Sequence, residues 1–407
     1  MPKNISKFHS GLIILALLSL NIVEQAASVI NGTIPGMAKA FPQQSLMNIE
    51  LVTTIVSVFV TIFVLVSGAV VKQIGQKQTA VLGLTIAAVS SIVPAFANNF
   101  MAILISRAVL GIGIGLANPL AISLIGVFFY GDERAKLMGW RSAIAGIGTA
   151  CMTFIAGQLL EINWHAAYWV YLLFWPTLIL FILFVPDPVK SGAIKRQEME
   201  QKKELAKNAK QGNHAKKDSV GLIISLAVLT FFTLIATMVF AVKLPTYFVQ
   251  NHIGSATDAS NVWSAVNVAT VVGGFLFGPC YKKLGKYILP VALILGGIAT
   301  SLTAVVNSLN MIYVIACISG IAGSLTIPYI FNRISEISSA QKAPFFTSIA
   351  LVGSNMGSFL SPVAGRLLGS QAQTAIFNAG IINVILAVIS LGVILYLNKK
   401  AARKVHA

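Results

Sequence analysis

The stretch GAVVKQIGQKQ, Gly68–Gln78, separates two apolar runs of the chain, residues 51–67 and 79–97. Its glycines, lysines and glutamines favour water or a membrane surface, whereas both flanking runs favour lipid or a protein core. A near copy, GPCYKKLGKYI, begins at Gly278, 210 positions later. Both stretches fit the pattern Gly-x-x-x-Lys-Gln/Lys-x-Gly-Gln/Lys, which marks equivalent loops in two copies of one unit.

The composition is that of a membrane protein. Of 407 residues, 56% are hydrophobic and 10% are charged, whereas soluble domains are about a quarter charged. A helix that spans a bilayer needs about 20 mainly apolar residues. The sequence predicts an all-α membrane protein with twelve transmembrane helices, at residues 11–34, 48–71, 79–98, 101–124, 138–160, 166–186, 220–244, 258–280, 287–306, 309–332, 345–368 and 374–397.

The first apolar run has one alternative interpretation. Lys3 and Lys7 precede the run and AAS follows its core, as in a secretory signal peptide. The run is long for such a signal, and its removal would leave an odd number of spans. We therefore predict that it is a transmembrane helix.

Basic residues are distributed unevenly between the loops. The net charge is +17, and 25 of the 29 lysines and arginines lie on one side of the membrane if the N-terminus is cytoplasmic. This distribution follows the positive-inside rule. It predicts a multi-pass protein of the cell membrane with both termini in the cytoplasm. The charge therefore favours anionic lipids at the cytoplasmic face as partners, and disfavours nucleic acid.

Further segments repeat at nearly the same offset. Pro35 and Pro245 are 210 residues apart, and GIGIGLANPLAIS from Gly111 matches GIAGSLTIPYIFN from Gly320. AGQLL and AGRLL recur at an offset of 208. The chain is therefore a duplication of a unit with six spans. Because six is even, both copies have the same orientation, which predicts two parallel-related six-helix bundles.

The duplication and the polar segments divide the chain. We predict an N-terminal bundle at 1–186, a basic cytoplasmic linker at 187–219, a C-terminal bundle at 220–398 and a basic cytoplasmic tail at 399–407. The expected assembly is a monomer.

The opening stretch resembles a known loop signature. GAVVKQIGQK is similar to the loop between the second and third helices of the major facilitator superfamily, Gly-x-x-x-Asp-Arg/Lys-x-Gly-Arg/Lys-Lys. Gly68 and Gly75 then provide tight turning and close helix approach, and Lys77 anchors the loop. In the family the acidic residue of this motif latches the two bundles together, but Lys72 stands in that place here, so the usual latch is not implied.

Two further motifs extend the resemblance over essentially the whole chain. Arg107 followed by Gly111 and Gly115 resembles the fourth-helix motif of this superfamily, and GIGTACMTFIAGQLL is a loose version of the fifth-helix motif of its bacterial drug/proton antiporters, without the Gly-Pro step. The resemblance implies the major facilitator fold and alternating access. The residues expected to support conformational change are Gly68, Lys72, Gly75, Lys77, Gly111, Gly115, Gly278, Lys282 and Gly285.

Glu24 is the one acidic residue predicted at mid-span. It lies eleven residues before Pro35, about 16 Å below the outer end of a straight helix. A charge at that depth costs about 3 kcal/mol on insertion and is rarely kept without a role. Burial disfavours the carboxylate, so Glu24 is a candidate proton carrier. The alternative is a neutral, hydrogen-bonded structural residue.

Two cations also lie within predicted spans. Arg107 lies about 9 Å inside the outer end of its helix, some turns above Glu24, and a long side chain can reach down to it. Arg107 then either forms a structural salt bridge or biases proton release from Glu24, the role that the resemblance implies. Lys243, two residues before Pro245, is expected to reach the interface with its ammonium group, and substrate contact is the alternative.

The remaining candidates would line a substrate pathway, and lipid-facing packing is the alternative for the aromatic ones. They are Gln25, Asn31, Asn118, Asn267, Trp263 and Tyr329. The sequence contains no phosphate-binding P-loop, no HExxH and no GxSxG. Its three cysteines lack metal-ligand spacing. We expect no catalytic residues, no metal and no cofactor.

The predicted function is secondary active transport driven by the proton gradient. Few charges lie along the pathway, which favours a small amphipathic organic substrate and efflux. A proton-coupled uptake symporter for a small nutrient is the main alternative. A membrane-embedded enzyme or a passive channel is more remote, because no catalytic constellation is visible and a channel needs neither an inward-facing acid nor a duplicated rocking unit.

Overall fold

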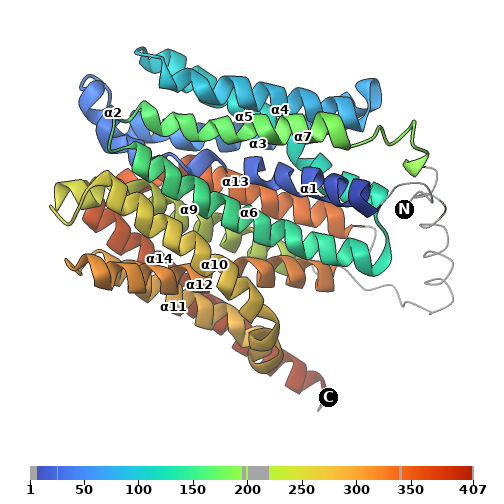
Figure 1. Cartoon of the computed structure of the whole chain (residues 1–407). Helices are drawn as coiled ribbons and strands as arrows, with labels where there is room; N and C mark the ends of the chain where they lie inside the picture. Colours follow the sequence, from blue (N-terminus) through green and yellow to red (C-terminus); the bar gives the residue numbers. More distant parts are fainter. Residues whose placement is uncertain (1–6, 25, 195–198, 200–219, 339–341, 406–407) are drawn as a thin grey trace. The chain divides into compact units, whose positions relative to one another are not determined.

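The described part of the chain is helical. The computed structural model describes residues 7–24, 26–194, 199, 220–338 and 342–405, and every regular element within these ranges is a helix (Figure 1). The chain divides into two compact units. The first comprises residues 1–44 and 51–215, and the second comprises residues 45–50 and 216–407. The division at 215/216 falls within the predicted linker 187–219, of which residues 195–198 and 200–219 lie outside the described residues.

Helices follow one another through both units with short connections. In the first part of the chain they are α1 (Lys7–Glu24), η1 (Ala26–Ser28), η2 (Asn31–Thr33), α2 (Ile34–Ala40), α3 (Leu46–Ile74), α4 (Gln76–Ile92), η3 (Val93–Ala95), α5 (Phe100–Phe128), α6 (Gly131–Leu159), η4 (Ala166–Leu173) and α7 (Phe174–Phe184). In the second part they are α9 (Val220–Gln250), α10 (Ala256–Leu284), η5 (Gly285–Tyr287), α11 (Ile288–Thr303), α12 (Leu309–Ile337), α13 (Ala343–Leu368) and α14 (Ala372–Val405).

The helices correspond to the predicted spans. Within the described residues, nine helical segments are long and apolar enough to cross a membrane, or ten if the bent pair Gly11–Val23 and Ala26–Ala40 counts as one. One of the nine, Ala256–Thr303, contains both α10 and α11 and so covers two predicted spans. Each of the twelve predicted spans overlaps helical segments of the described residues, and the predicted fold class is confirmed.

The first predicted span differs from expectation, because it is not one helix. α1 ends at Glu24, and the pieces on either side of residue 25 meet at 48°. Two short 3₁₀ turns follow before α2 begins at Ile34 with Pro35 in its first turn. Proline has no N–H, and its ring conflicts with a preceding helical turn, so a helix readily begins there but does not continue through it. The span predicted at 11–34 is therefore a bent pair of helical segments rather than one continuous helix.

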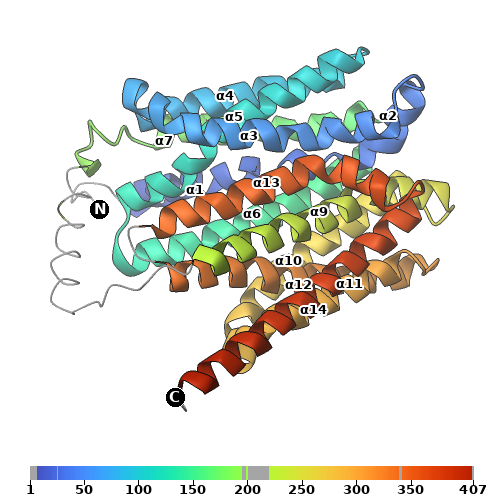
Figure 2. The ribbon, with the colours of Figure 1, turned by 180° about the vertical axis from the view of Figure 1, so that it is seen from behind.

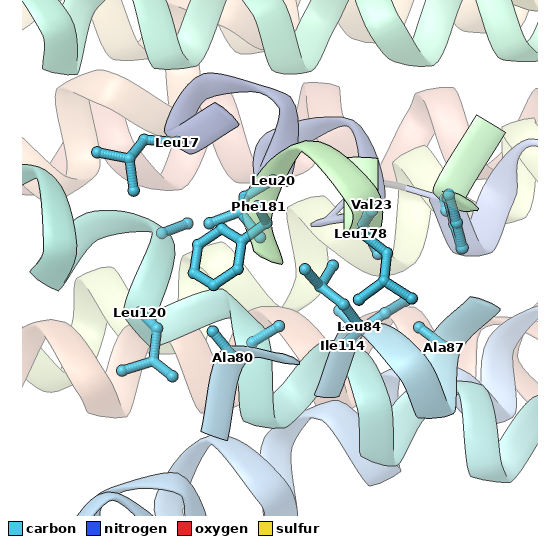
Figure 3. Close-up of a cluster of buried hydrophobic side chains, with 14 of the residues drawn as sticks. Leu17, Leu20, Val23, Ala80, Leu84, Ala87, Ile114, Leu120, Leu178 and Phe181 are labelled. Atoms are coloured by element: carbon cyan, nitrogen blue, oxygen red, sulfur yellow. The ribbon is translucent and has the colours of Figure 1, made fainter. Parts of the chain in front are cut away.

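The core of the first unit collects apolar side chains from α1, α3, α4, α5, α6, η4 and α7, and Figure 3 shows part of it. α1, α4, α5 and α7 each contribute residues that are at most 5% exposed. Lipid is as apolar as leucine, so these helices associate through close packing and polar contacts rather than through removal of water. The labelled residues of the cluster are Leu17, Leu20, Val23, Ala80, Leu84, Ala87, Ile114, Leu120, Leu178 and Phe181.

Glycines of α5 bring that helix close to two neighbours. A Cβ built at Gly111 would lie 2.6 Å from the Val56 carbonyl of α3, and one at Gly113 would lie 2.6 Å from the backbone of Ala87 in α4. A Cβ built at Gly115 would again meet α3, at 2.8 Å from the Val60 carbonyl. Alternate glycines therefore permit contact with α3 on one face of α5 and with α4 on another.

The same contact recurs in the second unit. A Cβ built at Gly320 of α12 would lie 2.6 Å from the carbonyl of Val266 in α10, as Gly111 does from Val56. Gly111 and Gly320 are 209 residues apart, and Val56 and Val266 are 210 residues apart. The two loop glycines that the repeat aligns, Gly75 and Gly285, both have positive φ, 87° and 52°, a backbone conformation that favours glycine. The internal repeat therefore preserves both a helix contact and a turn.

Neighbouring helices of the second unit form three long contacts. α9 packs against α13, α10 against α12, and α11 against α14. Figure 2 shows α11 beside α14. The last third of α9 is almost wholly buried, from Val239 to Phe248.

We predict that Gly113→Ala destabilises the protein. The added methyl group would meet the backbone of Gly83 and Ala87, which cannot move aside as a side chain can; such overpacking costs about 1–3 kcal/mol. The thermal midpoint of the purified protein in detergent should fall by several degrees. The control is Gly139→Ala on α6, where no atom lies within 4 Å of the new Cβ; equal midpoints for the two variants would contradict the packing argument.

Candidate functional site

Arg107 of α5 is the most deeply buried charge described in the first unit, with 0% of its surface exposed. Its Nε donates to the Val52 carbonyl of α3 at 3.2 Å, and one Nη donates to the Tyr171 hydroxyl of η4 at 3.0 Å. The other Nη donates to the Ala27 carbonyl at 2.9 Å. One guanidinium thus joins α3, η4 and the chain that follows α1.

Tyr171 completes this arrangement. Its hydroxyl accepts from Arg107 and donates to the Ala26 carbonyl at 2.8 Å. The guanidinium carbon also lies 5.4 Å from the centre of the Tyr171 ring, which is within range of a cation–π contact. Because α1 stops at Glu24, the carbonyls of Ala26 and Ala27 lack the partners of a continuous helix, and a lipid environment has no water to replace them. Arg107 and Tyr171 supply those partners.

Arg107 binds the backbone only three residues beyond Glu24, the candidate proton carrier. Glu24 is the last residue of α1, three residues before Ala27, and the side chain of Glu24 is outside the described part of the structure, as is the whole of Gln25. Counting along straight helices placed Arg107 some turns above Glu24. The guanidinium binds the backbone at Ala27, directly after the break in the first span.

The candidate pathway residues fall in both units. In the first, Asn31 is 4% exposed, and neither its amide nitrogen nor its amide oxygen has a partner among the described residues. Asn118 on α5 is half-buried. In the second, Asn267 donates within its own helix, to the carbonyl of Trp263 at 3.0 Å. Tyr329 is 5% exposed and packs against Tyr281.

Trp263 is 7% exposed, and its ring lies 5.6 Å from that of Phe240 in an edge-to-face contact. Its indole N–H has no partner within the described residues. Buried polar groups are normally paired. Asn31 and Trp263 therefore retain hydrogen-bonding capacity that a ligand could use, whereas Asn267 uses part of its own within α10.

The opening loop connects helices of its own unit. Gly75, at φ 87°, ends the turn between α3 and α4. Lys77 Nζ donates to the Ile182 carbonyl in the last turn of α7 at 3.0 Å, which places a cation at the negative end of that helix. Lys72 is exposed and makes no hydrogen bond or ion pair with any described residue. Gly68 is also exposed, and no described atom lies within 4 Å of a Cβ built on it.

Gln78 extends this connection to the segment after α7. Its Nε2 donates to Asp187 at 3.3 Å, and Asp187 also accepts from the backbone N–H groups of Val189 and Lys190. Burial acts to raise the pKa of Asp187, but these hydrogen bonds outweigh it, and the pKa lies below the ordinary value. The stabilisation is present above the ordinary carboxylate pKa and is lost as the pH falls through the lowered one.

The second copy of the loop has a different set of contacts. Gly285 ends α10 with positive φ, and no described atom approaches Cβ positions built on Gly278 or Gly285 within 4 Å. Tyr281, next to the exposed Lys282, donates to Glu336 of α12 at 2.8 Å. Glu336 also forms an ion pair with Arg333 at 2.9 Å.

A buried ion pair in the second unit was not found from the sequence. Lys243 Nζ of α9 lies 2.8 Å from Glu50 Oε1, and the two side chains are 8% and 0% exposed. The ammonium group of Lys243 was expected to reach the interface, but it is buried against Glu50 instead. A usable signal existed, because lone charges of opposite sign within apolar spans commonly pair with each other.

The described residues show no site for a metal ion. Within them, no three histidine, cysteine, aspartate or glutamate side chains gather closely enough to hold one. The arrangement instead offers ionisable and hydrogen-bonding groups buried among transmembrane helices. Such groups are suited to binding a proton or a small polar ligand.

Comparison with known proteins gives one family and several relatives. The family model described as Major Facilitator Superfamily matches residues 16–238 and 226–407. The chain is 29% identical to multidrug transporter protein MdtP of Bacillus subtilis over 168 residues, which is 40% of this chain and 30% of that protein. It is 24% identical to quinolone resistance protein NorA of Staphylococcus aureus over 349 residues, 83% of each chain.

Solved structures support the same fold. A peptide transporter POT has a TM-score of 0.75 at 12% identity, with 96% of this chain and 95% of that chain covered. A D-xylose-proton symporter has a TM-score of 0.73 at 16% identity, with 95% and 97% covered. At these identities the likeness extends to the fold alone.

We predict that Tyr171→Phe destabilises the first unit. Loss of the hydroxyl leaves one Arg107 N–H without its partner and removes the shorter of two hydrogen bonds to the Ala26 carbonyl, which keeps only the Val29 N–H at 3.4 Å, at a cost of about 1–3 kcal/mol. The thermal midpoint in detergent should fall, and the matched control is Tyr396→Phe, whose side chain is 66% exposed. A Tyr171→Phe variant as stable as that control would show that the hydroxyl is not needed at the α1 break.

Proposed function

Because the chain belongs to the major facilitator superfamily, whose members are transporters and not enzymes, we propose that it exports a small amphipathic organic compound in exchange for protons. The observation that carries this proposal is the buried Arg107 cluster beside the end of α1. It holds a fixed positive charge at the backbone that follows Glu24. A carboxyl group in such a place can alternate between a charged and a protonated form.

In the proposed mechanism Glu24 carries the proton and Arg107 biases its release. The guanidinium favours the carboxylate form of Glu24, which can attract a cationic or polar substrate. A proton arriving on Glu24 removes the negative charge and favours substrate release. Arg107 keeps its own hydrogen bonds to Val52, Tyr171 and Ala27 and so acts as a positioned charge.

Several observations support an organic substrate that is exported. MdtP and NorA, by their names, are a multidrug transporter and a quinolone resistance protein. Asn31 and Trp263 have unused hydrogen-bonding groups among apolar surroundings, and Asn118 is half-buried. A few polar groups among apolar ones suit amphipathic compounds. The second candidate is proton-coupled uptake, which the fold likeness to the D-xylose-proton symporter favours.

The protein is a multi-pass protein of the cell membrane. We propose that both termini are cytoplasmic, that the basic loops contact anionic lipids and that the carrier works as a monomer driven by the proton gradient. The uneven distribution of lysine and arginine supports the orientation.

The first test is Glu24→Gln. The change removes a charge that is costly in the membrane, so insertion should be unaffected, while extrusion driven by a pH gradient should be lost. The assay is efflux of a fluorescent amphipathic cation, ethidium, from proteoliposomes with an imposed pH gradient, run beside a wider panel of dyes. Glu161→Gln, at an exposed acid after α6, is the matched control. Normal gradient-driven transport by Glu24→Gln would overturn the assignment of Glu24.

The second test joins Arg107 to Glu24. Removal of the cation favours the protonated form of Glu24, so Arg107→Ala should shift the pH dependence of transport to higher pH by about 1–3 units. Arg107→Lys should shift it less, because the charge remains although the planar fork is lost. The Glu24→Gln variant is expected not to transport, so in that background the pH dependence of dye binding is measured instead. Arg107→Ala should not shift that pH dependence further. Additive shifts would show that Arg107 acts on another group.

A further inference from the structure

The Glu50–Lys243 ion pair lies apart from the Arg107 cluster. Glu50 Oε1 and Lys243 Nζ are 2.8 Å apart, and both side chains are almost wholly inaccessible. Gly365 of α13 makes room for the lysine, since a Cβ there would lie 3.0 Å from Lys243 Cε. Among the described residues, no other acidic side chain forms an ion pair with Lys243.

Glu50 occupies a particular place on α3. Ser45 and the first turn of α3, up to Glu50, belong to the second unit. The rest of α3, from Leu51 onward, belongs to the first. Two residues after Glu50, the Val52 carbonyl accepts the hydrogen bond from Arg107. One stretch of a single helix therefore carries both a partner of Lys243 and a partner of Arg107. A movement of the first turn of α3 would act on both contacts.

The energetics make this pair sensitive to protons. A buried ion pair is stable only while both charges are present, and loss of one leaves the other uncompensated at a cost of about 3–5 kcal/mol. A proton bound to Glu50 would leave the Lys243 ammonium in that position. An uncompensated buried ammonium either loses its proton or reaches water, and the second response requires the two side chains to separate.

We propose that Glu50 and Lys243 form a second ionisable site of the carrier, at which a proton arriving on Glu50 opens the ion pair and releases the first turn of α3 from α9. The proton comes from water and binds a carboxylate oxygen of Glu50, while Lys243 keeps its own proton and becomes hydrated. Loss of the proton to water restores the pair. This inference rests on the proposed function, because it assumes a carrier that binds protons during its cycle.

Other titratable side chains lie near the same ends of the helices packed on α9. Asp258 is held in the capping box of α10 with Ser255, and Arg366 of α13 is exposed. The test must distinguish Glu50 from these groups. By position along α9, α10, α12 and α13, the titratable residues toward these ends are Tyr247, His252, Asp258, Tyr313, Cys317 and Arg366.

The experiment measures a distance against pH. Spin labels are attached to cysteines placed at two exposed positions of the second unit, Ser45 and Asn251, in a chain whose native cysteines are replaced. Double electron–electron resonance then gives the distance distribution between about pH 8 and about pH 5, a range in which buried carboxyl groups commonly titrate. We expect a second, longer distance to grow as the pH falls.

Variants of the pair supply the comparison. Glu50→Gln should show the longer distance at every pH, and the neutral pair Glu50→Gln with Lys243→Met should show no pH response. The neutral pair leaves no uncompensated charge, so it guards against a folding defect in the single variant. The exchanged pair Glu50→Lys with Lys243→Glu should regain the pH response.

The outcome is independent of Glu24. If the labelled protein carrying Glu24→Gln still shows the pH-dependent distance, the Glu50–Lys243 site stands whether or not Glu24 drives transport. A distance that does not change with pH while Glu50 is intact would overturn the inference. So would an unchanged pH response in the neutral pair, because it would assign the response to another group such as Asp258.

Discussion

The requirement that the backbone be paired inside a membrane governs the first unit. A helix satisfies its own N–H and C=O groups, but a helix that stops within the lipid leaves carbonyls that no water can reach. α1 stops at Glu24, and the carbonyls of Ala26 and Ala27 are bound by Tyr171 and Arg107. The buried arginine is thus tolerated because its donors find acceptors, and the broken helix is tolerated because its acceptors find donors. Each irregularity stabilises the other.

The same constraint explains the place of α3. The helix packs closely on α5 because Gly111 and Gly115 have no side chains to keep the backbones apart. That approach brings the Val52 carbonyl within 3.2 Å of the Arg107 Nε. Small residues on one helix thereby determine which polar groups can meet on the others. Packing and electrostatics are therefore not separable in this unit.

Much of the fold could be predicted from the sequence, and much less of the site. Apolar length and the 210-residue repeat indicate twelve helices, since both signals can be read along the sequence without knowing which helices pack together. The break after Glu24 could not be predicted, because a rise per residue assumes an unbroken helix and the partners that stabilise the break come from α5 and η4. The pairing of Glu50 with Lys243 could not be predicted for a similar reason: it joins two residues that are far apart in the sequence. Tyr171 was missed because its apolar surroundings resemble ordinary core.

The duplication separates what the fold needs from what the function needs. The two copies keep the glycine contacts at Gly111 and Gly320, and they keep a glycine with positive φ after the first hairpin of each unit. Buried charges are not kept. Thr33 occupies the position that corresponds to Lys243 and donates to the Ile30 carbonyl, and the position that corresponds to Arg107 is Ala316, an apolar core residue. A packing requirement applies equally to both copies, whereas the proposed proton-binding site is needed in one copy only. The buried charges that occur in only one copy, more than the motifs that both copies share, therefore indicate where this carrier differs from a helical scaffold.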